Sequence, residues 1–182
     1  MITVAGLAIL KFPDGKMTGR ISAAQTPFLL MINNQFNGGS LEVPCPAGKP
    51  CYDSVRLLKV RSKVNPILQG ESVQLDIQTD VEGGIAELAC SEIVSDEDFK
   101  AFSQRLSEII ETRIRETVRH LQQERADLIG IGNKLSRTSL KLWADWQQSW
   151  SDQFAAMDVQ VQVHLKITNT GMQVSVPFSQ GK

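Results

Sequence analysis

The sequence predicts an α+β fold, in which a long amphipathic helix packs on one face of an antiparallel or mixed β-sheet. Between residues 95 and 128 apolar residues recur in steps of three and four, which is the helical period. Apolar and polar residues alternate over 73–82 and again over 158–168, which is typical of strands with one buried face. Because the helix needs a flat partner and the strands need a cover, the three segments are expected to pack together.

The predicted helix over 95–128 has a distinct start. Ser95 can accept a hydrogen bond from a free N–H group of the first turn, and the next three residues are acidic, which the helix dipole favours. Opposite charges four residues apart, such as Glu111 and Arg115, indicate a solvated face. The apolar stripe comprises Phe99, Phe102, Leu106, Ile109, Ile110, Ile114, Val118 and Leu121.

The N-terminal part predicts a hairpin followed by a short helix. Residues 2–12 and 16–21 are expected to be its strands, joined by a turn in which Gly15 allows a positive φ angle. Ser22 is expected to cap the helix, and Pro27 belongs in its first turn. Two asparagines and two glycines then end the helix.

The middle of the chain predicts three further strands. A brief strand over 41–43 precedes a proline-rich loop, and a long strand over 52–68 is expected to be interrupted near Pro66. The strand over 73–82 returns antiparallel to it across a turn. The Gly83-Gly84 pair is expected to bend the chain before it enters the long helix.

An aromatic stripe follows the long helix. Gly130 and Gly132 interrupt the helical pattern, and Ser136 or Thr138 is expected to cap a second helix. That helix would carry Leu142, Trp143, Trp146, Trp150 and Phe154. Tryptophans at this spacing more often belong to a core than to a ligand platform, so we expect Trp143 and Trp150 to be largely buried.

The composition is that of a globular protein and excludes some functions. The chain has 182 residues and a formal net charge of −1, and it has no basic cluster interleaved with aromatic residues, so nucleic-acid binding is not expected. Its longest apolar run, residues 4–10, is too short to span a bilayer, and the chain as given is expected to be soluble. We expect one domain over residues 1–182, with a possible subdivision near residue 50.

Three cysteines and two histidines are the candidates for a metal site. Cys45, Cys51 and Cys90 show no CxxC spacing, and only His120 and His164 could join them. We therefore expect structural thiols, with no metal and no cofactor. Cys45 and Cys51 flank a five-residue loop, so they could close a small disulfide in an oxidising compartment.

No catalytic arrangement is visible in the sequence. The GxSxG, GxxxxGK[ST] and HExxH motifs are all missing, and no nucleophile is accompanied by an evident base. The residues alone therefore predict a soluble α+β domain without a catalytic constellation. A small-molecule-binding or hydrolytic domain, with a pocket between helices and sheet, is the alternative.

A family resemblance adds to this. The C-terminal half resembles the C-terminal domain of the GerAC-type family, the C subunits of spore nutrient germinant receptors, through Gln122, Ala126-Asp127, Ile129-Gly130, Gly132, Trp143, Trp150, Phe154, the alternating valine strand and Thr170-Gly171. The front half agrees in order through residues 5–12, Gly19, the Leu29-Leu30 helix, residues 62–64 with Pro66, residues 81–83 and residues 85–87. The resemblance covers nearly the whole chain.

The resemblance implies a receptor subunit that is required for nutrient-triggered germination and acts by protein–protein contact. Its partners would be the integral membrane A and B subunits. The parent protein would be a lipoprotein on the outer surface of the inner spore membrane. This chain starts directly with a predicted strand, so we expect the lipid anchor and an N-terminal domain to lie outside it.

Candidate interaction residues are apolar or aromatic side chains that the fold is expected to leave exposed. In this sequence they are Phe28 and Met31 of the front-half helix, together with Tyr52 after the proline-rich loop.

Overall fold

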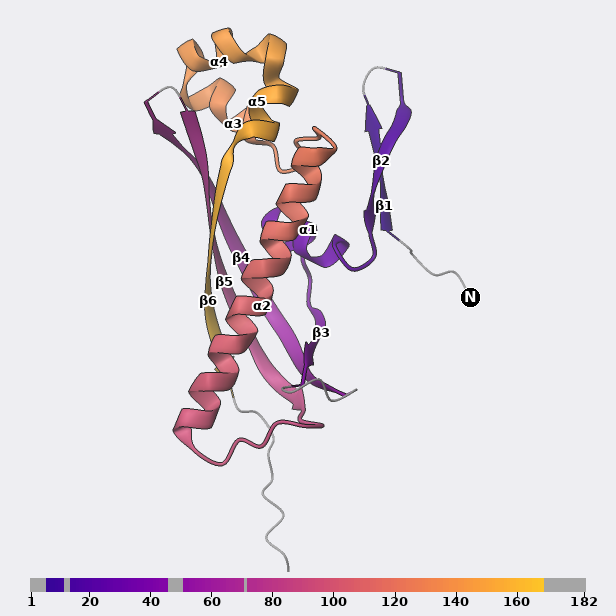
Figure 1. Cartoon of the computed structure of the whole chain (residues 1–182), viewed down its shortest axis with the longest axis vertical. Coiled ribbons are helices and arrows are strands. Elements are labelled where there is room, and N and C mark those ends of the chain that lie inside the picture. Colours follow the sequence, from indigo (N-terminus) through magenta and orange to yellow (C-terminus); the bar gives the residue numbers. More distant parts are fainter. Residues whose placement is uncertain (1–5, 12–13, 46–50, 71, 169–182) are drawn as a thin grey trace, which may run out of the picture.

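A four-stranded mixed sheet is the central layer of the fold, which a computed structural model describes for residues 6–11, 14–45, 51–70 and 72–168. The sheet has the order β3-β4-β5-β6, and a separate two-stranded hairpin stands apart from it (Figure 1). The sheet strands are β3 (Gly39–Pro44), β4 (Tyr52–Gln69), β5 (Ser72–Glu87) and β6 (Asp158–Thr168). The predicted residues 2–5, 12–13, 46–50 and Thr170-Gly171 lie outside the described part of the chain.

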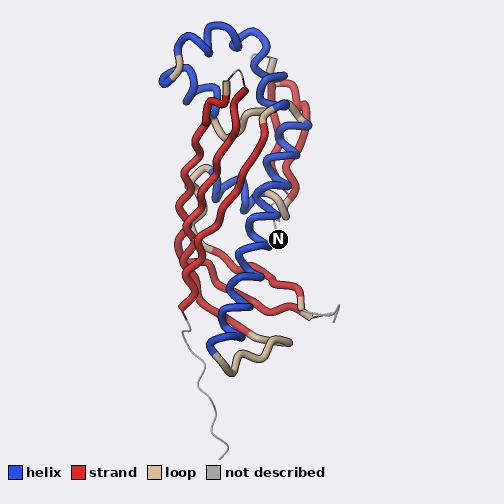
Figure 2. The backbone as a smooth tube through the Cα atoms, turned by 60° about the vertical axis from the view of Figure 1, so that its left-hand side comes forward, coloured by secondary structure: helices blue, strands red, loops and turns tan. Residues whose placement is uncertain are grey.

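The sheet combines antiparallel and parallel pairing. β3 pairs with β4 and β4 with β5 in antiparallel fashion, whereas β6 lies parallel to β5, with Leu75 opposite Val159. Apolar residues of one face are buried, and polar residues of the other face are largely exposed. Figure 2 shows α2 (Asp96–Gln123) along one face of this sheet. The predicted α+β arrangement is therefore confirmed.

Two expected breaks in the sheet are absent from the described strands. β4 continues through Pro66, which pairs in register with Leu75. This is tolerated because β3 pairs only with residues 52–57, so the distal part of β4 is a sheet edge that needs no N–H group there. β5 likewise continues through the Gly83-Gly84 pair, because at a shift in register glycine lets the two backbones approach closely.

α2 begins where the sequence predicts and ends earlier. Ser95 Oγ accepts a hydrogen bond from the Asp98 N–H group, and the Asp98 carboxylate accepts one from the Ser95 N–H group, which together form a capping box. The helix ends at Gln123 rather than at the expected Leu128, because Arg125 adopts a positive φ of 54°. Its buried stripe includes Leu106, Ile110, Ile114, Val118 and Leu121.

The predicted N-terminal hairpin is present as β1 (Gly6–Lys11) and β2 (Lys16–Ser22). The prediction that Ser22 caps the following helix is wrong. α1 (Thr26–Ile32) starts after Gln25, whereas Ser22 ends β2 and its Oγ accepts a hydrogen bond from the Gln25 N–H group at 3.3 Å. Ser22 therefore shapes the turn between strand and helix instead of starting the helix.

The single second helix expected from the aromatic stripe is divided. The chain forms α3 (Ile131–Thr138), α4 (Leu140–Trp146), the 3-10 turn η2 (Gln147–Ser149) and α5 (Trp150–Ala156), which cluster at one end of the sheet (Figure 1). Neither Ser136 nor Thr138 caps α4, because both belong to α3.

Glycine explains how this end packs. Gly130, at a φ of 75°, precedes α3, and a Cβ atom on Gly132 would lie 2.9 Å from the Trp150 ring. Trp143 and Trp150 are only partly buried, so the expectation that they are largely buried is not met, and their ring centroids lie 5.3 Å apart. Phe154 is the fully buried member of the stripe.

Two adjoining apolar clusters form the core. The first lies between the sheet, α1 and α2, and the second joins the hairpin to the end that holds α3 to α5. Ile9 and Ile21 anchor the hairpin in the second cluster, next to Leu121 of α2. In the described part of the chain, no helix has both the length and the apolar character needed to cross a membrane.

Candidate functional site

A groove of about 970 Å³ runs between α1, α2, β3 and the start of β4. Five consecutive residues, 38–42, line it, so it follows the backbone of β3 rather than one face of that strand. Its apolar lining comprises Ala24, Pro27, Phe28, Met31, Phe36, Leu41, Pro44, Leu57 and Ile109. Its charged lining comprises Glu42, Arg105, Glu108, Arg113 and Glu116. An apolar floor with a charged rim is typical of protein-binding surfaces.

All three predicted interaction residues line this groove, but they differ in exposure. Phe28 and Met31 are 4% and 1% exposed, because α1 turns them into the core beneath the groove. Tyr52 is 55% exposed at the start of β4. The expectation of exposure is therefore wrong for Phe28 and Met31 and correct for Tyr52.

Side chains bind individual residues at the other edges of the sheet. In β6, Val163 donates its N–H to Glu111 Oε1 and accepts from Ser107 Oγ, both at 3.0 Å and both from α2. Beyond β3, the edge of β4 is bound by Asn34, which accepts from the Ser62 N–H group at 2.7 Å and donates to its carbonyl at 2.9 Å. Lys134 Nζ donates to the Val64 carbonyl farther along the same strand. The sheet edge that adjoins the groove is that of β3.

A buried carboxylate lies near one end of the groove. Asp53 Oδ1 accepts the N–H groups of Cys90 and Ser91 at 3.1 and 3.2 Å. Its Oδ2 accepts from Ser91 Oγ at 2.5 Å and lies 3.3 Å from Arg105 Nη2. Burial raises the pKa of Asp53, but the hydrogen bonds from Ser91 and from the backbone N–H groups outweigh it and hold the pKa below its usual value. Arg105, which lines the groove, is thereby tied to the segment before α2.

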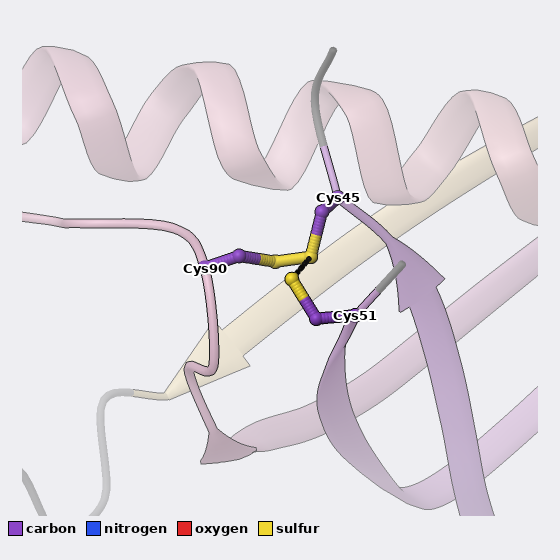
Figure 3. A group of neighbouring side chains, drawn as sticks. All are labelled: Cys45, Cys51 and Cys90. Atoms are coloured by element: carbon purple, nitrogen blue, oxygen red, sulfur yellow. Dashed lines mark hydrogen bonds between the residues drawn. A yellow bond between two sulfur atoms is a disulfide. The ribbon is translucent and has the colours of Figure 1, made fainter. Parts of the chain in front are cut away.

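The three cysteines gather at one point (Figure 3), and the Cys90 N–H group binds this carboxylate. A disulfide joins Cys45 to Cys90, so the suggested Cys45–Cys51 bond is not formed and Cys51 is a free thiol. Sequence spacing suggested Cys45 and Cys51 because they are close along the chain. It does not show that the segment after β5 returns to the end of β3. The sulfur atoms lie within 4.8 Å of one another, a grouping that could hold a metal only with all three cysteines as thiolates, and the sequence does not show that they come together.

The two histidines lie elsewhere. His120 Nε2 is 2.8 Å from the Arg20 carbonyl oxygen, and His164 Nδ1 is 3.3 Å from Asp80 Oδ1 on the exposed sheet face. Neither is part of the cysteine group in the described structure.

Together, the fold and the groove define a class of protein: an α+β domain whose long helix covers a mixed sheet, with a groove beside one sheet edge. The crystal structure of the GerBC protein has this fold, with a TM-score of 0.78 and 17% identity over 91% of this chain and 51% of that chain. The family described as "Spore germination B3/ GerAC like, C-terminal" matches residues 5–171, and the chain belongs to this family.

A curated relative agrees with this assignment. Spore germination protein YndF of Bacillus subtilis (strain 168) is 23% identical in an alignment that covers 93% of this chain and 42% of the relative. The chain thus spans about half the length of the proteins it matches or less. It is a C-terminal domain of the spore germination B3/GerAC-like family.

Proposed function

We propose that this domain is a non-enzymatic protein-binding module of a nutrient germinant receptor, and that its partners are the membrane A and B subunits. The observation that carries the proposal is the groove along β3, in a domain of this family. The parent protein would be a lipoprotein on the outer surface of the inner spore membrane.

The β3 edge suits an extended segment of a partner. A terminal strand offers backbone N–H and C=O groups that an added strand can bind, and pockets beside it can select the partner's side chains. Here the groove between β3 and α2 would receive apolar side chains over Phe28 and Met31. Arg105, Glu108 and Arg113 on its rim offer both signs of charge for orientation.

Tyr52 is the side chain best placed to contact such a partner. It is exposed and lines the groove, and tyrosine contributes a large contact area at low entropic cost. Because its side chain is largely solvent-exposed, its loss should leave folding nearly unchanged. Phe28 and Met31 act from beneath, since they shape the groove floor.

The test is a pull-down of the purified domain with the soluble portions of its A and B subunits, followed by an affinity measurement. Tyr52→Ala is expected to weaken binding about tenfold or more, as for a tyrosine hot spot of about 1.4 kcal/mol or above, with stability changed by about 0.5 kcal/mol or less. Leu140→Ala, at a position 73% exposed on α4, is the matched control and should bind as the wild type does. Equal affinities for all three proteins, or no binding by the wild type, would contradict the proposal.

A further inference from the structure

Three sulfur atoms meet at one corner of the sheet although they come from distant parts of the chain (Figure 3). Cys45 follows β3, Cys51 precedes β4, and Cys90 lies between β5 and α2. The Cα atoms of the Cys45–Cys90 disulfide are 5.9 Å apart, within the range that disulfides adopt. The free Cys51 Sγ lies 3.0 Å from Cys45 Sγ, so a thiol is in direct contact with a disulfide sulfur.

Backbone interactions hold the three residues in place. Pro44 and Tyr52 are the last registered pair of β3 and β4, so Cys45 and Cys51 lie opposite each other at the next position. The Cys45 N–H group donates to the Cys51 carbonyl at 3.3 Å. Cys90 is fixed by its N–H bond to the buried Asp53 carboxylate. The contact therefore follows from the sheet register and the Asp53 hydrogen bonds rather than from side-chain rotamers alone.

We propose that Cys45, Cys51 and Cys90 form a thiol–disulfide exchange site in which Cys51 is the attacking thiol and Cys45 the sulfur that changes partner. Cys51 gives up its proton and forms a new S–S bond with Cys45. The Cys45–Cys90 bond breaks, its electron pair leaves with the Cys90 sulfur, and that thiolate takes up a proton. One disulfide and one thiol are present before and after, so no oxidant or reductant is needed.

The two disulfides have different consequences for the fold. The Cys45–Cys90 bond joins residues 45 positions apart and fastens the segment before α2 to the end of β3. The Cys45–Cys51 bond would close a loop between residues only 6 positions apart and leave Cys90 as a thiol. Exchange therefore makes Cys90 open to modification, or to a mixed disulfide with a partner's cysteine, while the total number of thiols stays constant.

The test follows which cysteine reacts in the oxidised full chain. The protein is incubated at pH 8 with a low concentration of N-ethylmaleimide and sampled over time. All remaining thiols are then blocked at acidic pH with an excess of a thiol reagent of different mass. Trypsin cleaves after Arg56 and Lys63, which separates the peptide of Cys90 from the one that holds Cys45 and Cys51. Mass spectrometry without reduction then distinguishes the cross-linked pair of peptides from an internal disulfide.

Cys90 is expected to be labelled in the wild type at least tenfold faster than in Cys51→Ser, where the Cys45–Cys90 bond has no thiol to exchange with. Cys90→Ser is expected to form the Cys45–Cys51 disulfide, which shows that the second bond fits the fold. Equal, slow labelling of Cys90 in wild type and Cys51→Ser would overturn the proposal, as would two free thiols in oxidised Cys90→Ser. A purified protein whose three thiols react only after a chelator is added would hold a metal, and would also overturn it.

Discussion

Replacing Asp53 by asparagine tests the cluster that ties the groove to the segment before α2. The side chain keeps its size, and its one remaining oxygen can still accept from the N–H groups of Cys90 and Ser91. The NH2 group that replaces Oδ2 cannot accept a hydrogen bond, so Arg105 Nη2 loses its acceptor and faces a second donor. The substitution thus removes the negative charge and leaves the neighbouring backbone bonds possible.

The expected loss in the free energy of unfolding is about 2 to 3 kcal/mol. Hydrogen bonds to a charged group contribute about 1.5 to 3 kcal/mol each, and breaking a fully buried ion pair costs about 3 to 5 kcal/mol. The Arg105 side chain is 29% exposed, so solvent screens the ion pair. The expected cost therefore lies at the lower end of these ranges. The measurement is urea unfolding of the oxidised protein at pH 7, with the exposed Asp145→Asn as control.

The pH dependence gives a second readout. Because the pKa of Asp53 is lowered in the folded state, its contribution to stability is complete above the unfolded value of about 3.9 and is lost as the pH falls through the folded value. The gap between wild type and Asp53→Asn should therefore narrow as the pH falls below about 4. A gap that is the same at pH 7 and pH 3, or an Asp53→Asn protein as stable as Asp145→Asn at pH 7, would refute the reasoning.

Four further predictions concern packing and metal binding. Gly132→Ala should cost about 1 to 3 kcal/mol of stability in urea unfolding, because its Cβ would lie 2.9 Å from the ring of Trp150, and an unchanged midpoint would contradict this. Gly83→Ala should likewise destabilise by at least about 1 kcal/mol, since its Cβ would lie 2.6 Å from the Arg56 carbonyl oxygen. Its urea midpoint should fall below that of the wild type, and an equal midpoint would contradict this. Phe154→Ala should cost about 3 to 5 kcal/mol because Phe154 is fully buried, whereas the partly buried Trp150→Ala should cost less, and the reverse order would make the tryptophan the core residue. A chelator should leave the melting temperature of the oxidised protein unchanged, and a fall of several degrees would show that a metal supports the fold.

Sequence periodicity was sufficient to predict the elements that have one clearly apolar face. The bounds of β6 and the start of α2 at Ser95 agree with the prediction, because alternation and capping are local properties of the chain. Pro66 was misjudged because its tolerance depends on where β3 stops pairing, which is a property of the sheet. The division of the second helix into α4, η2 and α5 likewise has no local signal that we identified.

The candidate site was only partly predictable. Tyr52 is exposed as expected, whereas the orientation of α1 against α2 turns Phe28 and Met31 inward. The grouping of the cysteines depends on a contact between residues 45 positions apart, which spacing alone does not reveal. The groove itself arises between α1, α2, β3 and β4, so no single element predicts it.

The parallel pairing of β5 with β6 also bears on the order in which the chain folds. Residues 88–157 separate the two strands, so during synthesis β5 is complete long before its neighbour exists. Until β6 arrives, the middle of the sheet is an unprotected edge with apolar side chains on one face, a surface that invites aggregation. Chains truncated before Asp158 should therefore be prone to misassembly. β6 adds a strand to the sheet and also covers the exposed edge of β5.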